Sequence, residues 1–403
     1  MHLRWSMNAE LGACQRIITP AYTNTSRRRN RCGAHGNGTQ VGLRALMAKC
    51  YRCSYQEHQG GSMAKFPKHP QYIPVIKWQS WEQRALEKVD AELRPRMRPC
   101  IEVRTSKQHL NLLSKLQTVW PHDVLVDYSN PSGLLSHVRQ SELLDFMQHA
   151  VQQKIPASPV IGPAYVANMG AKFLKLAASL PGVGIRLRLG ALAVPNDKLQ
   201  LAKGAYAYLK AAGINTTLIV DLGVSPKEWS PAQVTSFGHD LNSLAAIGYQ
   251  SMHLVSGAYP ASLASVKTGS ATFQRSDWRF WYDVNANVPN LGLGFGDYGT
   301  LSPEWTEEIL ERRSNRIAIR YTRGVDWLIL RADGKTTNDS VAISEILVNT
   351  YPKDFKGAPY SFGDQILSER ADPTVPVKKK RCGHYHITEG WSHHIAYVLK
   401  EQY

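Results

Sequence analysis

From Tyr72 onward, short apolar runs alternate with segments in which apolar residues recur every three or four positions. Eight of the runs have the length and the continuous apolar character of strands that are buried on both faces. Each run is followed by a helical pattern or by a long crossover, and the clearest helical pattern covers residues 196–213. The eight runs cover residues 72–78, 97–103, 123–128, 158–165, 182–189, 216–223, 251–260 and 291–299.

This alternation predicts an α/β protein with a parallel sheet, which is either doubly wound or closed into a barrel. Eight units in about 230 residues favour the (β/α)8 TIM-like barrel, whose usual size is about 250 residues. The Gly-x-Gly-x-x-Gly sequence of dinucleotide-binding sheets does not follow the first run. We therefore expect a (β/α)8 barrel over residues 68–302.

After Pro303 the pattern changes, and residues 303–403 predict an α+β appendage packed on the barrel. Residues 306–313 predict a short charged helix, and residues 316–333 predict two strands joined near Arg323 and Gly324. Residues 340–351 predict an amphipathic helix. The final segment, residues 393–403, is expected to be another strand.

The first 62 residues have a different composition, which is polar and arginine-rich without helical or strand periodicity. We expect a disordered basic extension, with Met63 as an alternative start. Cys50 and Cys53 form a Cys-x-x-Cys pair, but the other cysteines and histidines of this segment match no common zinc module. The pair is therefore attributed to chance.

The formal net charge of +16 is compatible with nucleic-acid binding, although many basic proteins use such charge for solubility. No apolar run approaches the length needed to span a bilayer, so no membrane partner is expected. The six cysteines do not form a disulfide framework, which favours a cytoplasmic location.

The ends of the predicted strands carry the candidate chemistry. In such barrels the carboxyl ends of the strands meet at one mouth, where the loops build the site. The candidate catalytic residues are Lys77, Glu102, Asp127, Arg188, Asp221 and Asp297, and Ser256 ends the seventh run as a candidate binding residue. Charges at the ends of apolar strands are costly unless they are paired, solvated or bound to metal.

Two interpretations of these strand ends remain open. The carboxylates Glu102, Asp127, Asp221 and Asp297 are candidate ligands for a hard cation such as Mg²⁺, or candidate acids and bases of a hydrolase. Alternatively, each is an ordinary paired charge at a strand end. Lys77 also matches the position of the Schiff-base lysine in some pyridoxal phosphate barrels, but no phosphate-binding sequence accompanies it.

The segment from residue 378 to residue 394 combines a basic run, Lys378 to Arg381, with a group of possible metal ligands. The ligand group consists of Cys382, His384, His386, His393 and His394. The spacing fits no established metal module, so a solvated basic loop and histidines with ordinary partners are expected.

The order of several motifs resembles the phage and prophage beta protein family, named after a gene product of a satellite coliphage. The first of them is a strand that ends in Lys77 and Trp78, followed by a helix with Glu82, Ala85 and Leu86. The later motifs are residues 98–103, 255–260, 294–303, 319–331, 361–366 and 393–395. The resemblance runs from about Tyr72 to the C-terminus.

The resemblance implies a bacterial or mobile-element setting and a role in anti-phage defence, where the beta gene restrains a host-killing neighbour. It supplies no established reaction. The positions that match the family's motifs are Lys77, Trp78, Glu102, Gly296, Asp297, Tyr298, Gly299 and Asp364. Of these, Trp78, Gly296, Tyr298, Gly299 and Asp364 are candidate binding residues.

Two functional hypotheses of different class follow. The first is a defence or toxin-control protein that works by binding a protein partner or nucleic acid. The second is a metal-assisted hydrolase or phosphodiesterase that acts at the carboxylates of the barrel mouth. Fold alone does not separate them, because barrels support many chemistries.

Overall fold

The computed structural model describes residues 70–304, 316–382 and 386–403. Four expectations therefore lie outside the described residues: the extension (residues 1–62), the Cys50–Cys53 pair, the helix at residues 306–313 and His384. The described residues belong to one compact unit.

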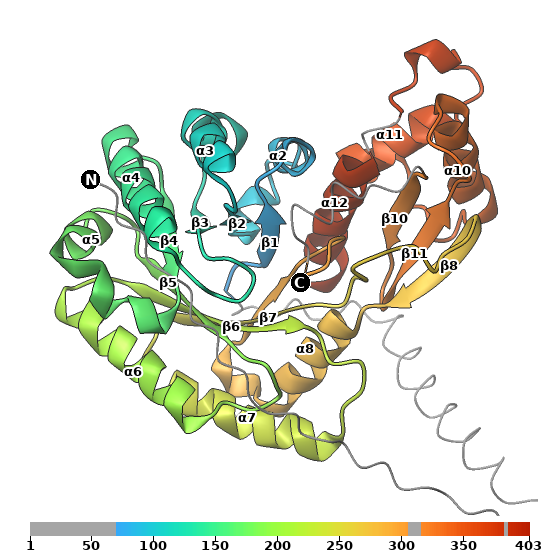
Figure 1. Cartoon of the computed structure of the whole chain (residues 1–403). Helices are drawn as coiled ribbons and strands as arrows, with labels where there is room; N and C mark the ends of the chain where they lie inside the picture. The colour runs from blue at the N-terminus through green and yellow to red at the C-terminus, as the bar shows by residue number, and fades with distance from the viewer. Residues whose placement is uncertain (1–69, 305–315, 383–385) are drawn as a thin grey trace, which may run out of the picture. The chain divides into compact units, whose positions relative to one another are not determined.

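Eight parallel strands close into a barrel with helices between them, as the alternation predicts (Figure 1). Closure is made by β1 and β9, which pair Ile73 with Gly296. The barrel strands are β1 (Ile73–Lys77), β2 (Cys100–Glu102), β3 (Val124–Asp127), β4 (Ala157–Ile161), β5 (Val183–Arg188), β6 (Thr216–Val224), β7 (Ser251–Gly257) and β9 (Gly294–Asp297).

Three of the helices between the strands begin at a side-chain cap. Thr105 and Ser136 accept backbone N–H groups at the starts of α3 and α4, and Ser230 forms a capping box with Gln233 at the start of α7. The helices between barrel strands are α2 (Ser80–Glu87), α3 (Ser106–Val119), α4 (His137–Gln153), α5 (Gly170–Ala177), α6 (Asn196–Ala211), α7 (Pro231–Ala245) and α8 (Ser276–Asn287).

The appendage is a three-stranded antiparallel sheet with helices (Figure 1). Its third strand, β8 (Gly269–Gln274), comes from within the range expected for the barrel and pairs with β11. The sequence did not reveal β8, because it is a polar edge strand with mostly exposed side chains. The other elements are β10 (Ala318–Thr322), β11 (Asp326–Arg331), α10 (Thr337–Thr350), α11 (Phe362–Ala371) and α12 (His386–Tyr397).

The expected C-terminal strand is wrong, because the segment is α12 followed by a π-helical turn over Val398–Gln402. Helix α12 packs against β10 and α11 of the appendage and against α2 of the barrel. It is therefore buried on nearly all sides, with Trp391 and Ile395 no more than 1% exposed. A helix buried all round loses the alternation of apolar and polar faces, so its short apolar run resembles a buried strand.

Helix α12 also restricts which residue can stand at position 299, in the loop after β9. Gly299 has φ +55°, and a Cβ atom there would lie 2.3 Å from the Trp391 ring. Gly299→Ala should therefore lower the free energy of unfolding by about 2 kcal/mol or more, through overpacking and backbone strain together.

Urea unfolding of the purified protein measures this effect. The matched control is Gly204→Ala on α6, where a Cβ atom meets nothing within 4 Å. In that helix interior alanine should stabilise the protein by about 0.5–1 kcal/mol. Equal effects of the two substitutions would contradict the close approach of Trp391.

Candidate functional site

The alternation of side chains along a strand decides which strand-end residues face the barrel interior. Interior apolar residues include Val75, Cys100, Leu125 and Ile219, which pack together. Two positions further along the same strands stand Lys77, Glu102, Asp127 and Asp221, so these four also point inward. Each of them is at most 1% exposed.

Arg186 of β5 lies at the centre of the three inward carboxylates. Its Nη1 donates to Asp127 Oδ2 at 2.6 Å and to Glu102 Oε1 at 3.0 Å, and its Nε donates to Asp221 Oδ2 at 2.9 Å. Its Nη2 donates to the Tyr298 hydroxyl at 2.6 Å, which in turn donates to Asp221 at 2.9 Å. One guanidinium therefore contacts groups from four other strands or their ends.

Three further cations complete this group. Lys77 pairs with Glu102 Oε2, and Arg104 Nη2 lies 2.6 Å from Glu102 Oε1. Arg188 Nη2 donates to Asp127 Oδ2 at 3.0 Å. We call these residues the mouth cluster: Lys77, Glu102, Arg104, Asp127, Arg186, Arg188, Asp221 and Tyr298. Its four cations face three carboxylates.

The cations keep Glu102 and Asp127 ionised. Burial alone would raise the pKa of Glu102, but Arg104, Lys77 and Arg186 outweigh it and hold that pKa well below its usual value. The pKa of Asp127 is also lowered, because Arg188, Arg186 and Arg104 outweigh burial. Burial lowers the pKa of Lys77 to about 8, although Glu102 opposes the shift. Glu102 and Asp127 are thus held as carboxylates and not as proton donors at neutral pH.

The mouth cluster does not fit a Mg²⁺ site, which is one of the two functional interpretations of the strand ends. A hard cation needs several carboxylate or carbonyl oxygens free to converge on it, whereas the guanidinium of Arg186 lies between these carboxylates. Across residues 70–304, 316–382 and 386–403, no group of three or more His, Cys, Asp or Glu side chains could hold a metal ion.

Asp297 does not belong to the mouth cluster, contrary to the expectation from its strand-end position. On β9 it shares a face with Phe295, which packs in the layer between strands and helices, while Tyr298 on the opposite face points inward. Asp297 Oδ1 accepts from the Tyr72 hydroxyl at 2.6 Å, and Oδ2 lies 2.9 Å from His394 Nε2. It therefore joins the barrel wall to α12.

The aspartates that end these strands form the same local hydrogen bond. The Oδ1 atoms of Asp127, Asp221 and Asp297 accept the N–H groups two residues later, at 2.7, 2.8 and 3.0 Å. Such a turn ends a strand, and the backbone N–H gives the carboxylate oxygen a hydrogen-bond donor without any ligand. The turn explains why an acid stands at each strand end, and tertiary contacts decide what else the acid meets.

A second aspartate–histidine pair stands beside the first. His393 Nδ1 lies 2.8 Å from Asp364 Oδ2, which also accepts from the Ser361 hydroxyl, and Tyr321 donates to Asp364 Oδ1 at 2.7 Å. Thr322 contacts both histidines, through its carbonyl oxygen to His393 Nε2 and through Oγ1 to His394 Nδ1, each at 2.9 Å.

The hydrogen-bonded series Thr322–His394–Asp297 has the order of nucleophile, base and acid in a hydrolase triad. Asp297 accepts from His394 Nε2, so Nδ1 is free to accept from the Thr322 hydroxyl. All three residues are 0% exposed, so substrate has no access to the hydroxyl. Burial lowers the pKa of His394, and a neutral ring suits this pattern. We assign these three residues a structural role.

The remaining predicted residues serve packing. Trp78 and Ser256 are buried on the outer face of the barrel wall, where Trp78 packs in the layer between strands and helices. A Cβ atom at Gly296 would lie 2.6 Å from Val255, which explains that glycine. Within the segment from residue 378 to residue 394, Arg381 pairs with Glu369, and Lys380 donates to the Arg370 carbonyl.

Sequence reasoning missed Arg186, Arg104 and Tyr72. The signal for Arg186 was present, because it stands two residues before Arg188 on a predicted strand and so shares its face. A charge in the middle of an apolar run is a stronger sign of an interior partner than a charge at its end. Arg104 lies beyond β2 and Tyr72 looks like an ordinary apolar residue, so neither gave such a signal.

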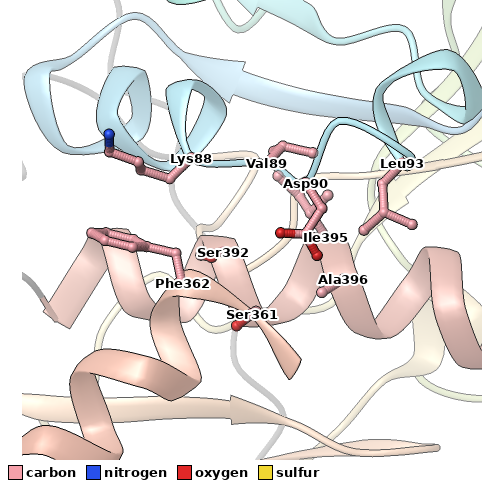
Figure 2. Close-up of a pocket in the computed structure, with 9 residues that line it drawn as sticks. All are labelled: Lys88, Val89, Asp90, Leu93, Ser361, Phe362, Ser392, Ile395 and Ala396. Atoms are coloured by element: carbon pink, nitrogen blue, oxygen red, sulfur yellow. The ribbon is translucent and has the colours of Figure 1, made fainter. Parts of the chain in front are cut away.

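A crevice and a larger hollow lie elsewhere, where the turn after α2 faces α11 and α12. The crevice in Figure 2 lies between Lys88 and Leu93 on one side and Phe362 and Ile395 on the other. Its volume of about 10 Å³ holds about one water. The adjoining hollow of about 470 Å³ is lined by residues that include Lys88, Asp90, Phe362 and Gln365. No residue of the mouth cluster lines either space.

The protein is therefore a (β/α)8 barrel with a buried ionic mouth and a fused α+β appendage. The model of the Beta protein family matches residues 72–400, and the chain belongs to that family. A search of curated proteins found no match. No helix in the described part of the chain is both long and apolar enough to cross a membrane.

The solved structures that match this chain share little of its sequence and align with only part of it. Arginine decarboxylase of Paramecium bursaria Chlorella virus is 12% identical, with a TM-score of 0.34 and 58% of each chain covered. Deoxyribose phosphate aldolase from Aeropyrum pernix is 13% identical, with a TM-score of 0.33, covering 53% of this chain and 80% of the aldolase. The spore cortex-lytic enzyme SleL of Bacillus cereus is 9% identical, with a TM-score of 0.35 and coverages of 61% and 75%.

Removal of Arg186 should be strongly destabilising. Arg186→Met leaves Asp127, Asp221 and Glu102 buried with one cation fewer, and breaking a buried ion pair in this way costs about 3–5 kcal/mol. Arg188→Gln should cost only about 1 kcal/mol, because Asp127 keeps Arg186 and Ser129 as partners. Chemical unfolding compares the two variants, and similar costs would contradict the central place of Arg186.

Asp277 should give the stability a distinctive pH dependence. It is 1% exposed, and burial, with the nearby Asp297 charge, raises its pKa to about 7 although Arg275 opposes the shift. Asp297 also contacts His394 and Tyr72, so these groups are part of the same environment. A carboxyl group with a raised folded pKa favours folding at low pH, and this contribution is lost as pH rises toward about 7.

The measurement is the free energy of unfolding of wild type minus that of Asp277→Asn, across pH 4 to 8. The difference should fall with rising pH, with a limiting slope of about 1.4 kcal/mol per pH unit, and level off above about pH 7. Asp283→Asn, at an exposed position on the same helix, is the matched control and should follow wild type. A flat difference for Asp277→Asn would refute the raised pKa.

Proposed function

We propose that this beta-family protein acts by binding, as a component of an anti-phage defence or toxin-control module of phage, prophage or bacterial origin. The observation that supports a binding role is the position of Arg186, which neutralises three carboxylates at the barrel mouth. A general acid or base must reach the substrate and exchange a proton with it. Glu102 and Asp127 are buried and held ionised by arginine, so they are poorly suited to that work.

Membership of the Beta protein family supports the defence setting, because the family resemblance implies a gene that restrains a host-killing neighbour. A cytoplasmic location is part of the proposal. Cys100 and Cys382 are free thiols, which fits a reducing compartment.

Two partners suit a binding role. The first is the protein product of a neighbouring gene, and the second is nucleic acid, which the basic composition favours. Nucleic-acid binding should weaken steeply with salt, because phosphate contacts release counterions. Weak salt dependence of the binding to a partner would therefore favour the protein.

The alternative is a metal-assisted hydrolase or phosphodiesterase at the mouth. It would require Glu102, Asp127 and Asp221 to give up Arg186 and to converge on a metal ion instead. This exchange leaves the guanidinium to find new partners in a buried site, which is costly. We therefore rank it second.

A phage-plating assay separates the two proposals. Asp221→Asn keeps the shape of a mouth-cluster side chain and removes its charge. If the protein works by binding, protection against phage should stay within a few-fold of wild type. If the carboxylate is catalytic, protection should fall by about 100-fold or more.

Asp197→Asn, at an exposed position in the first turn of α6, is the matched control, and the neighbouring genes are present in every strain. Each variant is first shown to be soluble, with circular dichroism like that of wild type. Loss of protection in Asp221→Asn alone, with binding of the partner unchanged, would overturn the binding proposal in favour of the hydrolase.

A further inference from the structure

The mouth cluster has more cationic charge and more hydrogen-bond donors than its own carboxylates can use. We propose that the barrel mouth binds the phosphate group of a small molecule, held by Arg188 at the rim and by the excess positive charge of the cluster. The inference deepens the proposed binding role and rests on it, since it assigns the mouth a ligand and no reaction.

The acceptors of the cluster are already engaged. Asp127 accepts from Ser129 on one oxygen and from two arginines on the other. Asp221 accepts from the Gly223 N–H on Oδ1 and from Arg186 and Tyr298 on Oδ2. Glu102 has Lys77 at one oxygen and Arg104 and Arg186 at the other. The carboxylates have little capacity left for another donor.

The donors are not exhausted. Arg188 hydrogen-bonds through Nη2, to Asp127 and to the Ser129 hydroxyl at 3.0 Å each, and its Nε lies 3.9 Å from Asp221, beyond hydrogen-bond range. Within the described ranges, the hydrogen bonds and ion pairs of Arg188 run through Nη2 and Nε, so its Nη1 is left without a protein acceptor. Arg104 Nε is buried without a partner, and the Arg104 side chain is 9% exposed. A ligand that suits this site must bring acceptor oxygens.

The charge of the cluster also favours an anion. Four cations stand against three carboxylates, which leaves one net positive charge in a region that is almost fully excluded from water. Electrostatic attraction is stronger in such surroundings than at an exposed surface. Arginine donates charge-assisted hydrogen bonds to phosphate oxygens, so the Nη1 donors of Arg188 fit a phosphate group.

Access favours a small ligand and not a polymer. The Arg188 side chain is 18% exposed, and Asp127 and Asp221 behind it are at most 1% exposed. The loop after β3 partly covers the Arg188 side chain. Gly133 of this loop has φ +89°, and a Cβ atom there would lie 3.2 Å from Arg188 Nη1. One partly covered arginine admits a single anionic group, whereas nucleic acid needs a row of exposed cations.

Isothermal titration of inorganic phosphate into the purified full chain tests the inference. Wild type should show saturable binding of one phosphate per chain. Arg188→Gln should bind about 10- to 100-fold more weakly, which is the expected cost of losing a charge-assisted contact. Lys115→Gln removes one positive charge from the exposed surface of α3 and should bind like wild type.

Arg188→Lys provides a second variant, which keeps the charge and loses the planar guanidinium donors, and its affinity should fall between those of wild type and Arg188→Gln. Thermal unfolding confirms that each variant is folded before titration. Absence of saturable phosphate binding to wild type would overturn the inference, as would equal affinity in wild type and Arg188→Gln. Because no phage or partner is present in the titration, either failure leaves the plating test of the proposed function untouched.

Discussion

Arg186 is the charge on which the organisation of the barrel mouth depends. Three carboxylates from three strands point into a water-poor interior, where isolated charges would be unstable. A planar guanidinium with donors in several directions can serve all three at once, which a lysine ammonium could not do with the same geometry. The arrangement leaves all three acids engaged with arginine, so the mouth presents hydrogen-bond donors and positive charge to a ligand that approaches it.

A second constraint joins the barrel to its appendage. Asp297 of β9 and Asp364 of α11 each hold one histidine of α12, and Thr322 of β10 contacts both rings. Four segments that resemble family motifs thereby meet in one buried contact, although about 100 residues separate Asp297 from His394. A motif that recurs in a family can thus reflect the joining of two parts of a fold and not chemistry.

The expectation that residues at the ends of the strands meet at the barrel mouth located most of the mouth cluster. It failed at Asp297 for a geometric reason. Five of the strand-end residues occupy alternate positions that face the barrel interior: Lys77, Glu102, Asp127, Arg188 and Asp221. Asp297 occupies the neighbouring kind of position on β9, which faces outward. The sequence contained the correction, since Phe295 shares the face of Asp297 and Tyr298 does not. A shift of one residue moves a side chain to the opposite face, so position along a strand must be combined with parity.

By itself, the sequence determined the eight strands, their order and most of the helices, because hydrophobic periodicity and caps are local properties. It also determined the strand-ending aspartate turns, which depend on a residue and its neighbour two positions later. Only the tertiary structure decided that β8 joins the appendage, that α12 is a helix buried all round, and that Arg186 lies between three acids. These features depend on contacts between residues distant in the chain, and local patterns carry no record of such contacts.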